Sequence, residues 1–231
     1  KYADIPRLCE PDYGLNLNRL DIPVNPYDAF KCDVPNLSTS LYFVVNDSFY
    51  TQQLPQARLP EGVIVDSLSR IATEQPELVS RYYGRLARTD SDGIVALNTM
   101  LAQDGLFIYV PKNVKVDRTI QVLNILRSDV DLMVNRRVLI IMEQGAEAKF
   151  LFCDHAADNR RFLATQVIEA FVGVNASLDL YCLEETHLLN TRTSNVYIEQ
   201  QADSRVNHNV ITLHNGVTCN RLDLVFKSDG A

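Results

Sequence analysis

The sequence lacks the features of secreted, membrane and nucleic-acid-binding proteins. Only five of its 231 residues are cysteine, and none form a Cys-x-x-Cys pair, which argues against a disulfide framework and for a reducing compartment. Lys and Arg number 22 against 29 Asp and Glu, so no basic surface invites nucleic acid or an anionic membrane. No apolar run approaches the length of a membrane span. We therefore expect a cytoplasmic protein that binds neither nucleic acid nor membrane.

Catalytic and cofactor motifs are also missing. The chain has no Gly-x-x-x-x-Gly-Lys-Ser/Thr loop, so any ATP chemistry would belong to a partner. Gly-x-Gly-x-x-Gly, His-Glu-x-x-His and Gly-x-Ser-x-Gly are absent as well. Glu184 and Glu185 are adjacent on a predicted strand, where they point to opposite faces and cannot act together on one substrate atom. We predict no catalytic, cofactor-binding or metal-binding residue in this chain.

What is present divides into three regions. Residues 1–60 form an irregular lead-in with short strands, because six of the nine prolines fall before residue 56. Residues 61–103 form a helical segment of three short helices. The first begins after an N-cap at Asp66 or Ser67, the second runs from Pro76 to Leu86, and the third covers residues 94–101. Residues 104–231 consist of strands.

The strand region repeats. Apolar runs at residues 138–142, 167–171 and 196–200 start 29 residues apart, and a run at 222–226 follows after 26. Each of the first three runs precedes a polar turn and a second strand, at 148–152, 178–182 and 206–210. Two strands per unit with this period predict a mainly β, stacked architecture. A parallel β-helix and an antiparallel sandwich both remain open, and the regular spacing favours the β-helix.

The second strands alternate, and the alternation predicts their inward row. Phe150 and Leu180 occupy equivalent inward positions, and His208 occupies the same position in the next unit. Such a histidine is more often a core residue than a functional group in a lumen. The other histidines are expected in surface turns: His155, His187 and His214.

The same alternation predicts which face of the strand each cysteine occupies. Cys153 and Cys182 are 29 residues apart, yet Cys182 stacks on Phe152 while Cys153 faces the other way. Their apolar neighbours raise a thiol pKa and favour a structural role. No Cys/His cluster has the spacing of a metal site.

Three basic features stand out, and we expect none of them to be a binding site. The pairs Arg136-Arg137 and Arg160-Arg161 lie near predicted turns, where solvated charge is the default expectation. Lys112 directly follows an apolar strand, and we expect it to anchor a turn.

Five motifs in register resemble the SufB/SufD family of iron-sulfur cluster assembly proteins. In order they are Gly62-Val-Ile, Ser67-Leu, Pro76-Glu-Leu-Val, Ala96-Leu-Asn and Asp104-Gly-Leu-Phe-Ile-Tyr-Val-Pro-Lys112. Of the two paralogous branches, the chain looks more like SufD. The resemblance implies a right-handed parallel β-helix, with residues of about 100–231 as its first coils.

The resemblance also implies a role. It implies a non-catalytic scaffold subunit that pairs with a SufB-like paralogue and acts with a SufC-like ATPase, with a homodimer as one state in isolation. An iron-sulfur cluster is expected only in the full complex, because the regions implied to hold it and to contact the ATPase lie beyond Ala231. The chain starts at Lys1 and stops soon after an apolar run, so we expect a fragment. Alternatives are a β-helix polysaccharide lyase, which would require secretion, the SufB paralogue, and an interaction module without a metal role.

Overall fold

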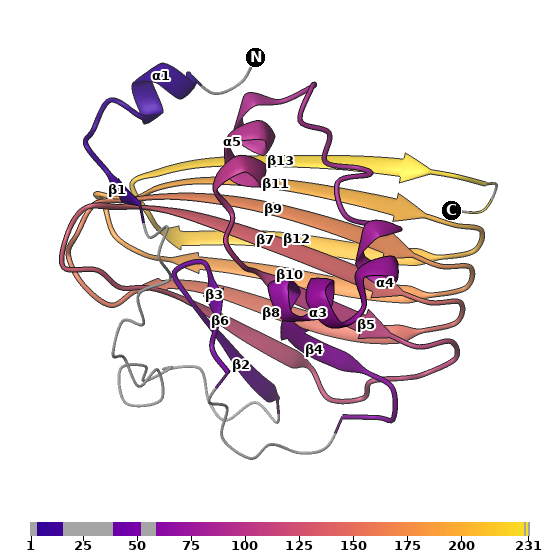
Figure 1. Ribbon diagram of the computed structural model, residues 1–231. Helices are drawn as coiled ribbons and strands as arrows, with labels where there is room; N and C mark the ends of the chain where they lie inside the picture. The colour runs from indigo at the N-terminus through magenta and orange to yellow at the C-terminus, as the bar shows by residue number, and fades with distance from the viewer. Residues whose placement is uncertain (1–3, 16–38, 52–58, 229, 231) are drawn as a thin grey trace.

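Two facing sheets wind into a β-solenoid of about four turns in the computed structural model (Figure 1). The structure describes residues 4–15, 39–51, 59–228 and 230. Each coil contributes one strand to each sheet, and successive coils stack in parallel. The first sheet runs in the order β13 (Val217–Phe226), β11 (Thr191–Gln200), β9 (Phe162–Val172), β7 (Leu132–Met142), β5 (Leu106–Val110) and β4 (Ile64–Ser67), with β1 (Gly14–Leu15) beside β7. The second runs β12 (Arg205–His214), β10 (Ser177–Glu185), β8 (Glu147–Ala156), β6 (Ile120–Leu126), β2 (Ser40–Val45) and β3 (Ser48–Phe49).

The parallel registers confirm the β-helix and rule out the sandwich for the coils, but the repeat is less even than predicted. Val138 pairs with Ile168, Ile168 with Val196 and Val196 with Leu222, which are steps of 30, 28 and 26 residues. The equal spacing of 29 was therefore an average, and Val167 aligns with Asn195. The second step is shorter in part because β10 has 9 residues where β8 has 10. The last step is the shortest because only residues 215–216 separate β12 from β13, whereas residues 186–190 separate β10 from β11.

The corners after the first-sheet strands stack as the predicted turns. Gly145, Asn175 and Asp203 all have a positive φ, at 68°, 57° and 56°. The Gly145 amide donates to the Val174 carbonyl at 2.8 Å, and the Asn175 amide to the Ala202 carbonyl at 3.0 Å. Gly, Asn or Asp thus recurs where the backbone needs the left-handed region.

The inward row is as predicted. Leu180 pairs with Phe150 on one side and His208 on the other, and Phe150 and Leu180 are fully buried in the apolar lumen. Phe152 and Cys182 also pair, and Cys153 faces away from the lumen, in a second apolar cluster with Phe43.

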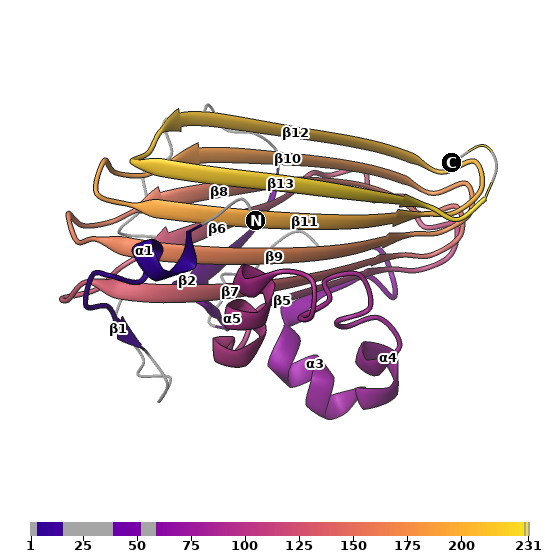
Figure 2. The ribbon, with the colours of Figure 1, turned by 90° about the horizontal axis from the view of Figure 1, so that it is seen from above.

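The helical segment packs on the outer face of the first sheet (Figure 2). It contains α3 (Leu68–Glu74), α4 (Pro76–Ser80) and α5 (Gly93–Leu101). Ser67 caps α3 by accepting from the Arg70 amide, as one of the two predicted caps. The prediction that the second helix reaches Leu86 was wrong: α4 ends at Ser80, and Gly84 turns the chain with a φ of 75°.

The lead-in supplies strands to both sheets, and α1 (Ile5–Leu8) precedes them. β1 pairs in parallel with β7, and β2 pairs in parallel with β6. The lead-in is thus part of the solenoid and not only an approach to it. Cys32, the fifth cysteine, lies outside the described residues.

Candidate functional site

Four charged side chains form a buried ladder inside the solenoid, and we call this set the lumen ladder: Arg136, Asp154, Glu184 and Arg192. Arg136 Nη1 lies 2.5 Å from Asp154 Oδ1, and Arg192 Nε lies 2.9 Å from Asp154 Oδ2. Arg192 Nη1 lies 3.7 Å from Glu184 Oε2. The ladder therefore joins both sheets across three successive coils.

The alternation of side chains between the two faces of a strand explains why these residues meet. Arg136 shares the inward face of β7 with Val138, and Asp154 shares that of β8 with Phe152. Their positions lie one step past the apolar part of each strand, so the charges stack at one level of the lumen. A smaller apolar cluster that includes Leu132 and Phe162 lies beyond them.

Further hydrogen bonds extend from the two ends of the ladder. Arg136 Nε donates to the Asn46 carbonyl at 2.8 Å. Glu184 accepts from Thr212 Oγ1 and Asn215 Nδ2, both at 2.9 Å, and from Thr218 Oγ1 at 3.1 Å. Thus Glu184 carries the network into β12 and β13, the last coil of this chain.

The pKa values of Asp154 and Arg192 are shifted towards their charged forms. Burial alone would raise the pKa of Asp154, but the guanidinium groups of Arg192 and Arg136 outweigh it and lower that pKa. Burial lowers the pKa of Arg192, yet Asp154 and Glu184 raise it above the ordinary value. Two cations and two anions cancel, and Asp154, bound on both oxygens and shifted away from neutral pH, is poorly placed for proton transfer.

A thiol and an imidazole lie beside the ladder in the same lumen. Cys182 Sγ is 4.0 Å from His208 Nε2. Burial raises the pKa of Cys182 to about 12, and burial followed by the charge of Arg192 lowers the pKa of His208. At neutral pH the pair is therefore a neutral thiol next to a neutral imidazole, which is not an activated nucleophile.

The prediction of solvated charge for Arg136-Arg137 was wrong. Arg137 faces the outer side of β7, where its Nη2 lies 2.6 Å from Glu169 Oε2, and both side chains are buried under the helical segment. Glu169 also accepts from the amides of Gly84, Leu86 and Ala87. The sequence signal that could have shown this is a charged pair inside a mostly apolar eleven-residue strand, with one acid, Glu169, in the equivalent strand of the next coil.

The motifs that carry the family resemblance fasten elements together. Asp104 accepts from Ser67 Oγ at 2.7 Å, from the Ser69 amide and from the Phe49 amide. Gly105 lies so close to β7 that an added Cβ would sit 2.1 Å from the Arg137 carbonyl oxygen. Asn98 of α5 donates to the Arg136 carbonyl and to Thr165. Each of these residues holds a helix or strand against the coils.

The other histidines and basic residues were expected in or near turns, and the structure places them as follows. His187 and the pair Arg160-Arg161 lie in or beside turns, as predicted. His214 was expected in a turn but is the exposed last residue of β12, directly before residues 215–216. His155 does not lie in a turn: it lies within β8, half-buried, and burial lowers its pKa. β8 continues beyond the polar residues that suggested a turn, because its neighbours β6 and β10 extend to the same level. Lys112 is exposed just after β5.

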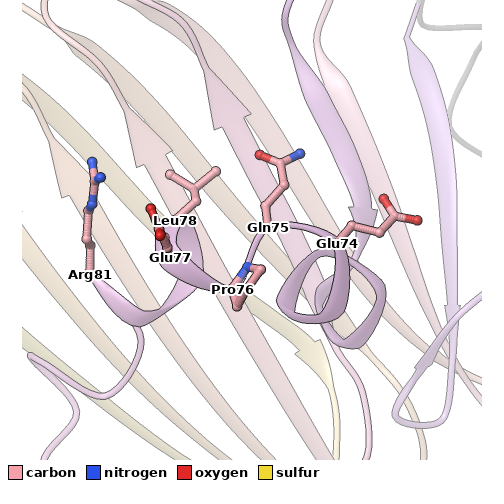
Figure 3. Close-up of a pocket in the computed structure, with 6 residues that line it drawn as sticks. All are labelled: Glu74, Gln75, Pro76, Glu77, Leu78 and Arg81. Atoms are coloured by element: carbon pink, nitrogen blue, oxygen red, sulfur yellow. The ribbon is translucent and has the colours of Figure 1, made fainter.

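A pocket of about 410 Å³ lies where α3 meets α4 (Figure 3). It is lined by one continuous stretch that includes Glu74, Leu78 and Arg81. Glu74 and Arg81 lie at its opposite ends in Figure 3, so they do not converge on one ligand atom.

The described ranges contain neither a metal-ligand cluster nor a membrane-spanning helix. Among residues 4–15, 39–51, 59–228 and 230, no group of three or more His, Cys, Asp or Glu side chains is arranged to hold a metal ion. No helix within those ranges is long and apolar enough to cross a membrane.

Comparison with known proteins places two family profiles end to end on this chain. The SufBD protein N-terminal region matches residues 1–122, and the SufBD core domain of the SUF system for FeS cluster assembly matches residues 125–231. The boundary falls at β6, inside the solenoid, so the two profiles divide one continuous stack.

Named relatives agree with the profiles. The SufBD family protein ABCI9 of Arabidopsis thaliana is 27% identical over 177 residues, which are 76% of this chain and 36% of that protein. The chloroplastic protein ABCI8 of the same plant is 30% identical over 118 residues, or 51% of this chain and 21% of that protein. SufD of Bacillus subtilis is 28% identical over 148 residues, or 63% and 34%. The chain spans about a third or less of the length of these relatives, and it belongs to the SufB/SufD family of iron-sulfur cluster assembly proteins.

Proposed function

We propose that this chain is part of a non-catalytic, SufD-like scaffold subunit that pairs with a SufB-like paralogue and acts with a SufC-like ATPase. The observation that carries the proposal is that the residues of the family motifs make structural contacts. Ser67, Asn98, Asp104 and Gly105 hold helices and strands against the solenoid. These contacts hold the elements in a rigid arrangement, as a scaffold requires.

The state of the ionisable groups supports a role without catalysis. Asp154 is charged and bound on both oxygens, and Cys182 has a pKa of about 12. General acid-base and nucleophilic catalysis work best with groups poised near neutral pH. In this proposal, an iron-sulfur cluster binds only where the assembled complex supplies the full set of ligands. The protein is proposed to act in the cytoplasm.

Co-expression tests the proposal. The protein is produced with its SufB-like and SufC-like counterparts and purified through one tag on the SufB-like chain. We expect all three to elute together, and the complex to gain the visible absorption of an iron-sulfur cluster when iron and sulfide are supplied anaerobically. Recovery of the SufB-like and SufC-like chains without this protein would contradict the proposal. Activity of the isolated protein on an acidic polysaccharide would favour the lyase alternative.

The SufB alternative is tested in the same system. The SufB-like counterpart is omitted, and this protein is purified with the ATPase alone. A SufD-like subunit should assemble no cluster under these conditions, whereas a SufB-like subunit should. ATP hydrolysis by this protein alone is not expected.

A further inference from the structure

Two carboxylates of the lumen ladder lie side by side. Asp154 and Glu184 occupy directly paired positions of β8 and β10, and both are buried. Like charges at paired positions of neighbouring strands repel each other. Arg192 of β11 offsets this repulsion, because its Nε lies 2.9 Å from Asp154 Oδ2 and its Nη1 lies 3.7 Å from Glu184 Oε2. This balance of charge therefore requires β8 and β10 to pair in the observed register.

The apolar part of the lumen does not distinguish this register from one that is shifted by two residues. Side chains alternate between the two faces of a strand, so a shift by two keeps every inward side chain inward. Phe150, which pairs with Leu180, would then lie beside Leu178 or Cys182, and both of these are also buried inward residues. Apolar contacts would be exchanged for other apolar contacts.

The lengths of the coils do not prevent such a shift either. Equivalent positions of the first sheet are separated by 30, 28 and 26 residues in successive coils, so a coil can lose two residues while its neighbours stay paired. The pairing of β10 with β12 itself shifts directly after the ladder: Glu184 pairs with Thr212, whereas Glu185 pairs with His214. The pairing is regular up to Glu184 and irregular beyond it.

A shifted register would separate the charges of the ladder. Moving β10 by two residues along β8 would set Asp154 beside Cys182 in one direction, and Glu184 beside Phe152 in the other. Either shift carries one carboxylate away from Arg192 inside the lumen. A buried charge without its partner is strongly unfavourable, whereas the replacement of a complete buried ion network by apolar residues is often neutral or stabilising. The ladder therefore penalises wrong registers more than it stabilises the right one.

We propose that the lumen ladder fixes the register in which the coils stack. The alignment of Asp154 with Glu184 at Arg192 is the feature that selects the observed pairing of β8 with β10 and rejects pairings shifted by two residues. A stack of similar apolar coils needs such a feature, because its inward rows alone tolerate the shift. Single polar residues in the apolar seams of coiled coils set register in a comparable way, at a cost in stability.

Engineered disulfides on the outer face of β8 and β10 report the register. Lys149 and Asp179 are directly paired there, so their Cα atoms are about 4.8 Å apart, which a disulfide can span. Ser177 and Tyr181 lie two residues to either side of Asp179, at about 8 Å from Lys149 by strand spacing and rise, which is too far. Lys149→Cys with Asp179→Cys should therefore cross-link in the otherwise wild-type protein, and Lys149→Cys with Ser177→Cys or Tyr181→Cys should not. Mass spectrometry of the peptides identifies each cross-link.

The test removes all four charges of the ladder in one variant: Arg136→Met, Asp154→Leu, Glu184→Met and Arg192→Met. We expect this charge-free variant to keep its β-sheet circular dichroism and to unfold near the wild-type urea concentration, but to form a shifted cross-link as well as the native one. Arg88→Met with Asp90→Leu is the control, because it removes an exposed ion pair, and it should form the native cross-link alone. A folded charge-free variant that forms the native cross-link alone would overturn the proposal.

A single substitution decides the question if the charge-free variant does not fold. Arg192→Met leaves Asp154 and Glu184 side by side without the cation between them, and a shift by two residues would separate the two carboxylates. A folded Arg192→Met variant should therefore form a shifted cross-link, and the native cross-link alone would count against the proposal. Failure of both variants to fold would also overturn it, because the charges would then be needed for the fold itself and not for the choice of register.

Discussion

Arg137 and Glu169 form an ion pair of 2.6 Å on the outer face of neighbouring coils, buried under the helical segment. Tyr83 covers the Arg137 guanidinium, whose carbon lies 4.5 Å from the centre of the ring. Three amides of residues 84–87 donate to Glu169. A pair that lies 32 residues apart in sequence thus fixes the helical segment to the solenoid.

Breaking this pair should strongly destabilise the fold. Glu169→Ala leaves Arg137 buried and unpaired, so we expect a loss of about 3–5 kcal/mol in the free energy of unfolding. Urea denaturation measures it. The exposed pair Arg88–Asp90 is the control, and Arg88→Ala should unfold at nearly the wild-type urea concentration. Equal losses in the two variants would contradict a locking role for Glu169.

The inward row gives a second stability prediction. Phe150→Ala and Leu180→Ala each remove a fully buried side chain from adjacent coils, at an expected cost of about 2–5 kcal/mol. Leu188→Ala, in an exposed turn, should unfold at nearly the wild-type urea concentration. A wild-type unfolding midpoint for both core variants would show that the lumen packs loosely enough to tolerate the cavities.

The elements that follow from local patterns could be predicted from the sequence. Alternation placed Phe150, Leu180 and His208 in one row, and capping chemistry placed the start of α3 at Ser67. Polar and small residues marked the corners at Gly145 and Asn175. The cap and the corners depend on neighbours within a few positions of the chain, and the row depends on aligning the alternating strands of successive units.

The buried ion pairs between strands were beyond that reasoning. Arg136 was predicted to be solvated because it lies near a predicted turn, and nothing local in the sequence shows that Asp154, 18 residues away on the facing sheet, is its partner. The register had to be known to within one residue, and an average period of 29 cannot supply it when the true steps are 30, 28 and 26. A shift by one residue moves a side chain from the lumen to the outer face.

The lumen ladder predicts how stability depends on pH. The guanidinium groups of Arg192 and Arg136 overcome the effect of burial and lower the pKa of Asp154 in the folded state. A lowered folded pKa contributes stability above the ordinary aspartate pKa of about 3.9, and this contribution is lost as the pH falls through the folded pKa. Asp154→Asn should therefore be less stable at neutral pH, and its stability should fall less steeply with acid.

Urea denaturation between neutral and acidic pH measures both effects. Asp129→Asn changes a carboxylate that is 93% exposed, and its curve should follow the wild type. Parallel curves for wild type and Asp154→Asn would show that the ladder does not couple protonation to folding.

The last prediction separates structure from sulfur chemistry at the buried thiols. Cys153 and Cys182 are buried on opposite faces of the second sheet, and burial raises the pKa of Cys182 to about 12. Cys182→Ser places a hydroxyl in the apolar row and should cost about 1–3 kcal/mol if that group stays unsatisfied. Cys153→Ser should likewise reduce stability. Cys182→Ala adds no polar group, so its effect should come from lost volume alone.

These variants are then compared in the complex with the SufB-like and SufC-like partners. We expect both serine variants to lower the yield of soluble protein while cluster formation per folded complex stays at the wild-type level, because a neutral buried thiol is a poor sulfur acceptor and a poor metal ligand. Cys219→Ser, in the half-buried outer row of β13, controls for the loss of any thiol. Loss of cluster formation with unfolding free energy unchanged would instead make Cys153 or Cys182 a sulfur carrier or a ligand, and the lumen would then be a chemical site as well as a core.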